Sequence, residues 1–107
     1  MSYDLYLSMD TGNGDSITED IGNYTSNISN MYEAAGLGHI EDYDDKLAKD
    51  CIEALRKAVT HMENNSSIHT ALEPPNGWGD YEGALEFLTK TLRMCIKHPN
   101  AILRVWC

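Results

Sequence analysis

The chain begins with a stretch in which apolar and polar side chains alternate over residues 3–10. This period of two is typical of a strand that buries one of its faces. The expected buried side chains are Tyr3, Leu5, Leu7 and Met9. Two glycines in the next segment, residues 12–15, allow positive φ angles and predict the end of the strand. Residues 16–26 are polar and lack a period, so we expect an ordered loop there.

Three later segments place apolar side chains three or four residues apart, which predicts three helices. The first covers about residues 27–35 and ends at Gly36. The second follows an acidic segment in which Asp44 or Asp45 could cap it. Its expected apolar stripe consists of Ala48, Cys51, Ile52, Leu55, Ala58, Val59 and Met62. The third helix starts at Asp80. Its expected buried side chains are Tyr81, Ala84, Leu85, Leu88, Leu92, Cys95 and Ile96.

Residues 102–106 are dense in strand-favouring side chains and predict a short final strand. The order strand, helix, helix, helix, strand contains no repeat and no linker, which predicts one domain over residues 1–107. We expect an α+β fold in which three helices pack on one face of a small sheet. The N- and C-terminal strands should form this sheet together, because neither is stable alone in water. Leu55 and Leu88 lie on the facing stripes of the two long helices and should occupy the centre of the core.

The charge of the chain narrows the choice of partner. The 107 residues include 17 acidic and 8 basic side chains, which give a formal net charge of −9. Such a chain repels phosphates, so we expect no direct binding to nucleic acid and favour a partner with a basic surface. The chain has neither a basic start followed by a long apolar run nor a membrane-length apolar segment, which predicts a cytoplasmic protein without membrane contact. Cys51 and Cys95 fall on apolar helical faces and should be reduced core residues.

One tripeptide raises the question of catalysis, because Asp10-Thr11-Gly12 follows a hydrophobic strand as the catalytic tripeptide of aspartic proteases does. About half of the chain is predicted to be helical, and amphipathic helices cannot build the sheets of those proteases. We therefore interpret the match as chance. The four histidines lack the HExxH spacing of a metal site, and the acidic residues 41–45 lack the glycine of a calcium loop. The sequence thus predicts no catalytic residue, no metal ligand and no cofactor.

Two blocks, "IGNYTSN" and "EPPNGWGDYEG", combine polar and aromatic side chains at the ends of predicted elements, where scaffolds often carry binding groups. We predict that they lie side by side, with the end of the first strand close by. The candidate ligand- or partner-binding residues are Asp10, Asn23, Tyr24, Thr25, Asn27, Trp78, Asp80 and Tyr81. In the competing interpretation the first block hydrogen-bonds only its own backbone. There Trp78 folds back on the core, and Asp80 is an ordinary N-cap.

The blocks "YDLYLSMDTG", "GNYTSNIS" and "PPNGWGDYEGALEFL" resemble a family of small proteins found in phage and bacterial genomes. The resemblance covers most of the chain, from Tyr3 to about Pro99. It supplies no catalytic residues, and it implies a phage-type context in which small acidic proteins often block host defence or redirect host machinery. We therefore expect a non-enzymatic protein of the host cytoplasm that captures a host protein with a basic surface or a small polar ligand. The alternative is a small hydrolase or metal-dependent enzyme that uses Asp10, Asp80 and Asn27 as neighbouring polar groups.

Overall fold

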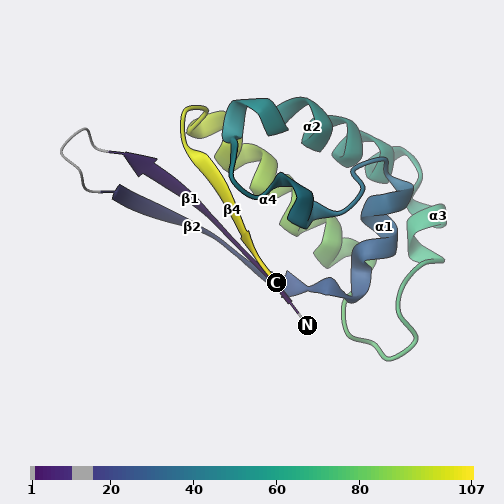
Figure 1. The fold of residues 1–107 in the computed structure, drawn as a ribbon. Helices are drawn as coiled ribbons and strands as arrows, with labels where there is room; N and C mark the ends of the chain where they lie inside the picture. Colours follow the sequence, from purple (N-terminus) through teal and green to yellow (C-terminus); the bar gives the residue numbers. More distant parts are fainter. Residues whose placement is uncertain (1, 11–15) are drawn as a thin grey trace.

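The computed structural model describes residues 2–10 and 16–107. The predicted turn at residues 12–15, and with it Thr11 and Gly12 of the Asp-Thr-Gly tripeptide, lies outside the described residues. In chain order the elements (Figure 1) are β1 (Ser2–Asp10), β2 (Ser16–Thr25), the 3-10 turn η1 (Ser26–Ile28), α1 (Ser29–Ala34), the 3-10 turn η2 (Ile40–Tyr43), β3 (Lys46–Leu47), α2 (Ala48–Asn64), α3 (Ser66–Thr70), α4 (Tyr81–Lys97) and β4 (Ile102–Trp106).

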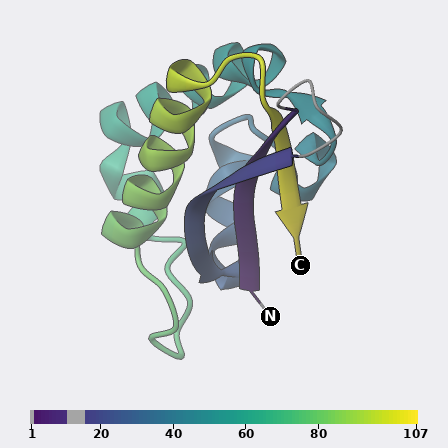
Figure 2. The ribbon, with the colours of Figure 1, turned by 90° about the vertical axis from the view of Figure 1, so that its left-hand side faces the viewer.

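The strands form one antiparallel sheet in the order β2-β1-β4-β3. The predicted pairing of the terminal strands is confirmed, since Leu5 lies opposite Val105 and Leu7 opposite Leu103. The helices pack on one side of the sheet (Figure 2). The α+β fold is therefore confirmed, and the structure adds two strands and a short helix to the elements that the sequence predicts.

The core lies between the inner face of the sheet and the two long helices. Leu55 of α2 and Leu88 of α4 are 1% and 0% exposed, as predicted. Ile96 was expected in the buried stripe of α4, and this prediction is wrong, because its side chain is 49% exposed. Phe87 and Thr91 are buried instead. The buried stripe runs through Ala84, Leu88, Thr91 and Cys95, which are four, three and four residues apart, and Ile96 lies outside this stripe.

The cysteines lie where the helical patterns predict. Cys51 and Cys95 are both free and buried, which confirms them as core residues, whereas Cys107 is free and exposed. Burial, with a smaller contribution from nearby Cys51, raises the pKa of the Cys95 thiol to about 12. A thiol with so high a pKa is a poor nucleophile at neutral pH, because the thiolate is the reactive form.

The segment expected to be a loop at residues 16–26 is instead the edge strand β2. The register shifts between Leu5 and Tyr6, which lie opposite Gly22 and Asp20, so that Ile21 is the extra residue of a β-bulge. Before the bulge, odd-numbered residues such as Ile17 lie on the same face of the sheet as Met9. After the bulge, even-numbered residues such as Tyr24 lie on the same face as Tyr3. The bulge therefore breaks the period of two along the sequence while keeping the strand continuous.

The start of α2 also differs from the prediction, because neither Asp44 nor Asp45 caps it. Leu47 occupies the N-cap position, and the backbone N–H groups of Ala48 and Lys49 donate to carbonyls of the α4–β4 connection at 2.7 and 2.9 Å. The Asp44 carboxylate instead accepts from the backbone N–H of Val105 at 2.8 Å. This bond is the main reason why the pKa of Asp44 is lowered. None of the helices in the described part of the chain is long and apolar enough to cross a membrane.

Candidate functional site

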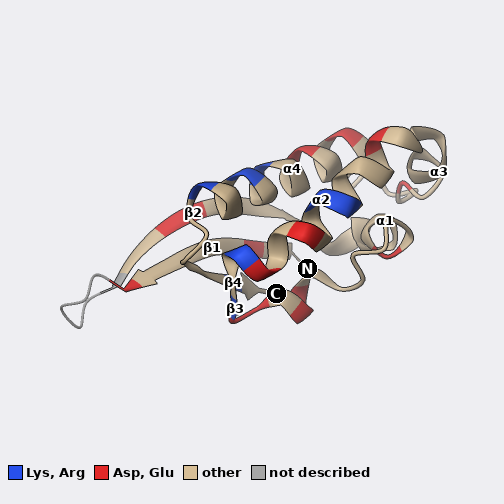
Figure 3. Ribbon diagram, turned by 90° about the horizontal axis from the view of Figure 1, so that it is seen from above, with Lys and Arg blue, Asp and Glu red and all other residues tan. Residues whose placement is uncertain are grey.

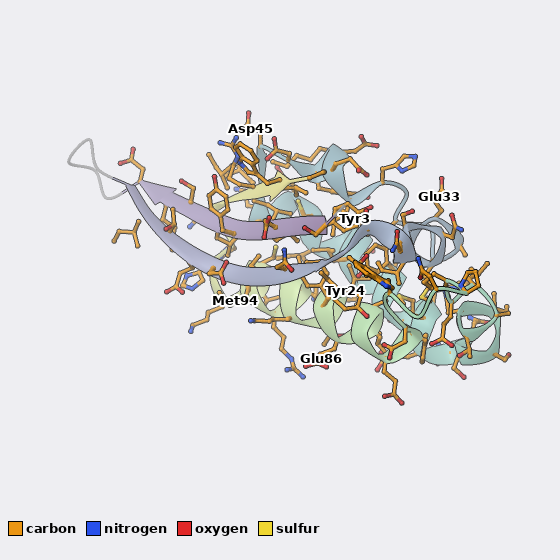
Figure 4. The ribbon with its side chains drawn as sticks, turned by 90° about the horizontal axis from the view of Figure 1, so that it is seen from below. Tyr3, Tyr24, Glu33, Asp45, Glu86 and Met94 are labelled. Atoms are coloured by element: carbon orange, nitrogen blue, oxygen red, sulfur yellow. The ribbon has the colours of Figure 1, made fainter. Side chains whose placement is uncertain are left out.

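The two polar-aromatic blocks lie side by side, as the sequence predicts. The hydroxyl of Tyr24 in β2 accepts the backbone N–H of Asp80 at 3.0 Å and lies 3.5 Å from the carboxylate of Asp80. The Tyr24 ring also packs against Phe87 of α4, with the ring centroids 5.8 Å apart. Figure 4 shows Tyr24 on the side of the molecule where β2 passes over α4. One side chain thus joins the end of β2 to the start of α4.

Glycine allows the second block to approach the first. Gly79 has a φ of 102°, and a Cβ at this position would lie 2.6 Å from Thr25 Cγ2 and 2.9 Å from Ile28 Cγ2. Both distances are shorter than real Cβ contacts, so another side chain would push the loop away from η1. Gly83, in the first turn of α4, is similarly confined by the ring and hydroxyl of Tyr24.

The loop between α3 and α4 has a well-defined backbone. The side-chain oxygen of Asn76 accepts the N–H of Trp78 at 3.0 Å, and the carboxylate of Asp80 caps α4 by accepting the N–H of Gly83 at 2.7 Å. The carboxylate of Glu73 accepts the N–H of Tyr81 at 2.9 Å, which closes the loop across its base. We call residues 73–81 the Trp78 loop.

The indole of Trp78 faces solvent. Its residue is 70% exposed, so the interpretation in which Trp78 folds back on the core is wrong. Gly77 and Gly79 have positive φ angles on either side, and the turn they form directs the side chain away from the protein. An ordered backbone therefore presents a large apolar side chain to solvent.

Most of the other candidate residues hold the fold together. The amide of Asn23 donates to Asp4 Oδ1 at 2.8 Å across the β1–β2 ladder. Thr25 Oγ1 accepts the N–H of Asn27 at 3.3 Å, which caps η1, and the side chain of Asn27 is exposed. The hydroxyl of Tyr81 donates to the carbonyl of Met62 at 2.7 Å, tying α4 to α2.

Asp10 does not belong to this cluster, which corrects the prediction that it lies close by. Asn23 lies opposite Asp4, so Asp10 is six residues further along β1. At about 3.3 Å per residue this separation is roughly 20 Å. The reason is the antiparallel pairing, which places the end of β1 beside the start of β2. Asp10 instead lines a hollow of about 410 Å³ with Lys97 and His98.

The alternative of a small enzyme assumed that Asp10, Asp80 and Asn27 are neighbours, and this assumption is wrong for Asp10, which lies far along β1. The Asp80 carboxylate caps α4. Among the residues that the structure describes, no group of three or more His, Cys, Asp or Glu side chains could hold a metal ion.

Sequence reasoning missed a pair of histidines next to the Trp78 loop. His61 Nδ1 and His69 Nε2 lie 3.0 Å apart, and the buried His69 ring stacks on Tyr81 with the centroids 6.3 Å apart. Burial, followed by repulsion from His61, lowers the pKa of His69. The pair joins α2 to α3, a helix of five residues that is too short to be read from periodicity.

A second feature that the sequence did not reveal is a groove of about 260 Å³ between β2 and α4, which we call the β2–α4 groove. Its floor includes the buried Ile21 and Phe87. Its full lining is Ile21, Gly22, Asn23, Tyr24, Gly83, Glu86, Phe87 and Lys90. The loop assignment of residues 16–26 concealed this groove, because one of its walls is the strand β2.

Compared with known proteins, the chain matches no protein-family model, no curated protein and no solved structure. The resemblance to small phage and bacterial proteins therefore stays a prediction.

Proposed function

We propose that this protein is a non-enzymatic binding module that captures a partner protein through the Trp78 loop. The observation that carries the proposal is a tryptophan that is 70% exposed on a loop whose backbone is hydrogen-bonded to the side chains of Glu73, Asn76 and Tyr24. Burying an exposed tryptophan would stabilise the fold of the free chain. Its exposure on an ordered loop suggests that a partner covers it.

The order of the loop matters for affinity. Tryptophan is among the residues that contribute most at protein interfaces, where it fills a pocket of the partner. A loop that is ordered before binding loses little conformational entropy in the complex, so more of the contact energy appears as affinity. A protein partner suits this geometry better than a small polar ligand, because small-molecule sites enclose most of the ligand surface.

The charge near the loop indicates the chemistry of the partner. Glu73 and Asp80 belong to the loop, and Glu82 and Glu86 follow in the first turns of α4, within a chain of net charge −9. A partner with a basic surface around an apolar pocket is therefore favoured. Together with the resemblance to phage proteins, this favours a protein of a bacterial host, whose activity the binding would block or redirect.

The test compares two exposed tryptophans. Trp78→Ala should leave the melting temperature nearly unchanged and weaken binding to a partner captured from a host lysate by about 30-fold, the equivalent of about 2 kcal/mol. Trp106→Ala is the matched control, because Trp106 in β4 is 65% exposed but lies on a different element. Unchanged binding by the Trp78 variant, or an equal loss in both variants, would contradict the proposal.

A further inference from the structure

The second half of α4 carries a row of cations that the fold does not neutralise. Lys90, Arg93 and Lys97 are three and four residues apart, which places them along one side of the helix, and all three are exposed. In the described part of the chain, none of the three forms an ion pair. Figure 3 shows these blue positions on the half of α4 that lies beside β2.

This row is unusual in so acidic a chain, because it holds three of the eight Lys and Arg residues. A cation in the last turn of a helix is favoured by the helix dipole, and this accounts for Lys97. It does not account for Arg93, whose neighbours four residues before and after are Thr89 and Lys97. Lys90, in contrast, follows Glu86 by four residues, which is a favourable spacing. Arg93 and Lys97, four residues apart, also repel each other. An anionic partner would relieve this repulsion.

The row borders the β2–α4 groove. Lys90 lines the groove, and its Nζ lies 3.9 Å from the position that a Cβ on Gly22 would occupy. Lys90 and Arg93 together line a neighbouring hollow of about 490 Å³ on the outer side of α4. The α4 wall of the groove carries Lys90 together with Glu86, and Arg93 lies beyond them in the neighbouring hollow. A ligand in the groove would therefore meet an apolar floor and would reach the row of cations toward the C-terminal end of α4.

The opposite wall is the edge of the sheet. Within the described strands β2 is terminal and pairs only with β1. An unpaired strand edge is a template for a further strand, and proteins commonly guard such edges with charged side chains. Glu19 and Asp20 are exposed on β2, and the bulge at Ile21 interrupts the edge beside them, but the stretch from Gly22 to Tyr24 beside the groove pairs regularly with β1 and carries no charge. A strand edge that faces a helix across an apolar groove suits an extended peptide, which adds to the sheet as a new strand.

We propose that the β2–α4 groove binds an extended acidic peptide segment of a partner protein, which pairs with the edge of β2 and places its carboxylates against Lys90 and Arg93. The occupant is a peptide and not a nucleic acid, because a long polyanion would also meet the repulsion of a chain with a net charge of −9. A short acidic segment lies mainly within the local field of the row, since charges beyond about 10 Å are screened. The β2–α4 groove does not include Trp78, so the inference goes beyond the proposed function and is tested independently of it.

The first experiment selects ligands from a random heptapeptide library on the immobilised protein. Peptides recovered by the wild type should be enriched in Asp and Glu, and Lys90→Glu/Arg93→Glu should not recover them. Lys49→Glu/Arg56→Glu is the matched control, because it makes the same change of charge at exposed positions of α2. Recovered peptides without acidic enrichment, or an equal loss with the control variant, would overturn the proposal.

A second set of measurements tests the binding mode with one recovered peptide, labelled with fluorescein. Its affinity should fall at least tenfold in Lys90→Glu/Arg93→Glu, and it should be unchanged in Trp78→Ala. The bound peptide should slow amide hydrogen exchange in residues 21–24. Loss of peptide binding in Trp78→Ala would assign the peptide to the Trp78 loop, and equally tight binding of a short oligonucleotide would indicate a general polyanion surface. Either result would refute this inference while leaving the proposed function to its own test.

Discussion

Gly83→Ala should destabilise the protein, although the same change in an open helix is stabilising. Gly83 lies in the first turn of α4, where alanine would contribute up to about 1 kcal/mol through helix propensity. Here the added Cβ would overlap the hydroxyl of Tyr24, and it would lie 2.7 Å from Tyr24 Cζ and 2.9 Å from Asp80 Oδ1. Tyr24 must therefore move.

The size of the effect follows from the contacts that this movement breaks. Losing the hydrogen bond between Tyr24 and Asp80 should cost about 1 kcal/mol, and weakening the Asp80 cap should cost about another 1 kcal/mol. Displacing the Tyr24 ring from Phe87 adds roughly 0.5–1.5 kcal/mol. After subtraction of the gain in propensity, we expect a net loss of roughly 2 kcal/mol in the free energy of unfolding.

The assay is urea unfolding of a double-mutant cycle with Tyr24→Phe. Phenylalanine lacks the hydroxyl that the Cβ would overlap, and the hydrogen bond to Asp80 is already absent in this background. Gly83→Ala should therefore cost about 1 kcal/mol less there than in the wild type. A stabilising Gly83→Ala variant, or a coupling energy of zero, would refute the placement of Tyr24 against α4.

Three further predictions concern the core, the sheet edge and the histidine pair. Leu88→Ala should lower the free energy of unfolding by about 2–5 kcal/mol in urea titration, whereas a loss below about 1 kcal/mol would mean that this helix face is not core. Asp44→Ala should cost about 1–2 kcal/mol, because the N–H of Val105 loses a charged acceptor, and an unchanged midpoint would contradict this role. His69 has a lowered folded-state pKa, so the unfolded chain binds its proton more readily. Stability should therefore decline as the pH falls below about 6.5, and NMR titration should give a pKa of His69 below that value.

The sequence predicts the fold wherever a periodic pattern is uninterrupted. The alternation in β1 and the helical stripe around Leu55 gave the correct elements, because one face of each is buried along its whole length. The pattern failed in β2, where a single extra residue, Ile21, moves the apolar positions from odd to even numbers. The cap of α2 was also unpredictable, since its first N–H groups donate to the distant carbonyls of Pro99 and Ala101.

The sequence predicts the candidate site only in part. The proximity of the two blocks follows from their positions at the ends of neighbouring elements, whereas the exclusion of Asp10 depends on the direction of β2, which requires recognition of that strand. The exposure of Trp78 could not be read from its sequence neighbours. Glycines on both sides allow the turn to direct the indole inward or outward, and the close approach of Gly79 to Thr25 and Ile28, which leaves no room for a Cβ, joins segments that are far apart in the sequence.

Tyr24 decides which substitutions can separate the two proposed surfaces. Its ring lines the β2–α4 groove and its hydroxyl accepts the N–H of Asp80 at the base of the Trp78 loop. Removing Tyr24 would therefore disturb both surfaces, and a loss of binding in that variant would assign the partner to neither. Trp78→Ala and Lys90→Glu/Arg93→Glu change only side chains that are exposed, so the backbone of the loop and the floor of the groove should persist. A partner that loses affinity in both of these variants must contact both surfaces, because neither variant removes a hydrogen bond or ion pair of the described fold.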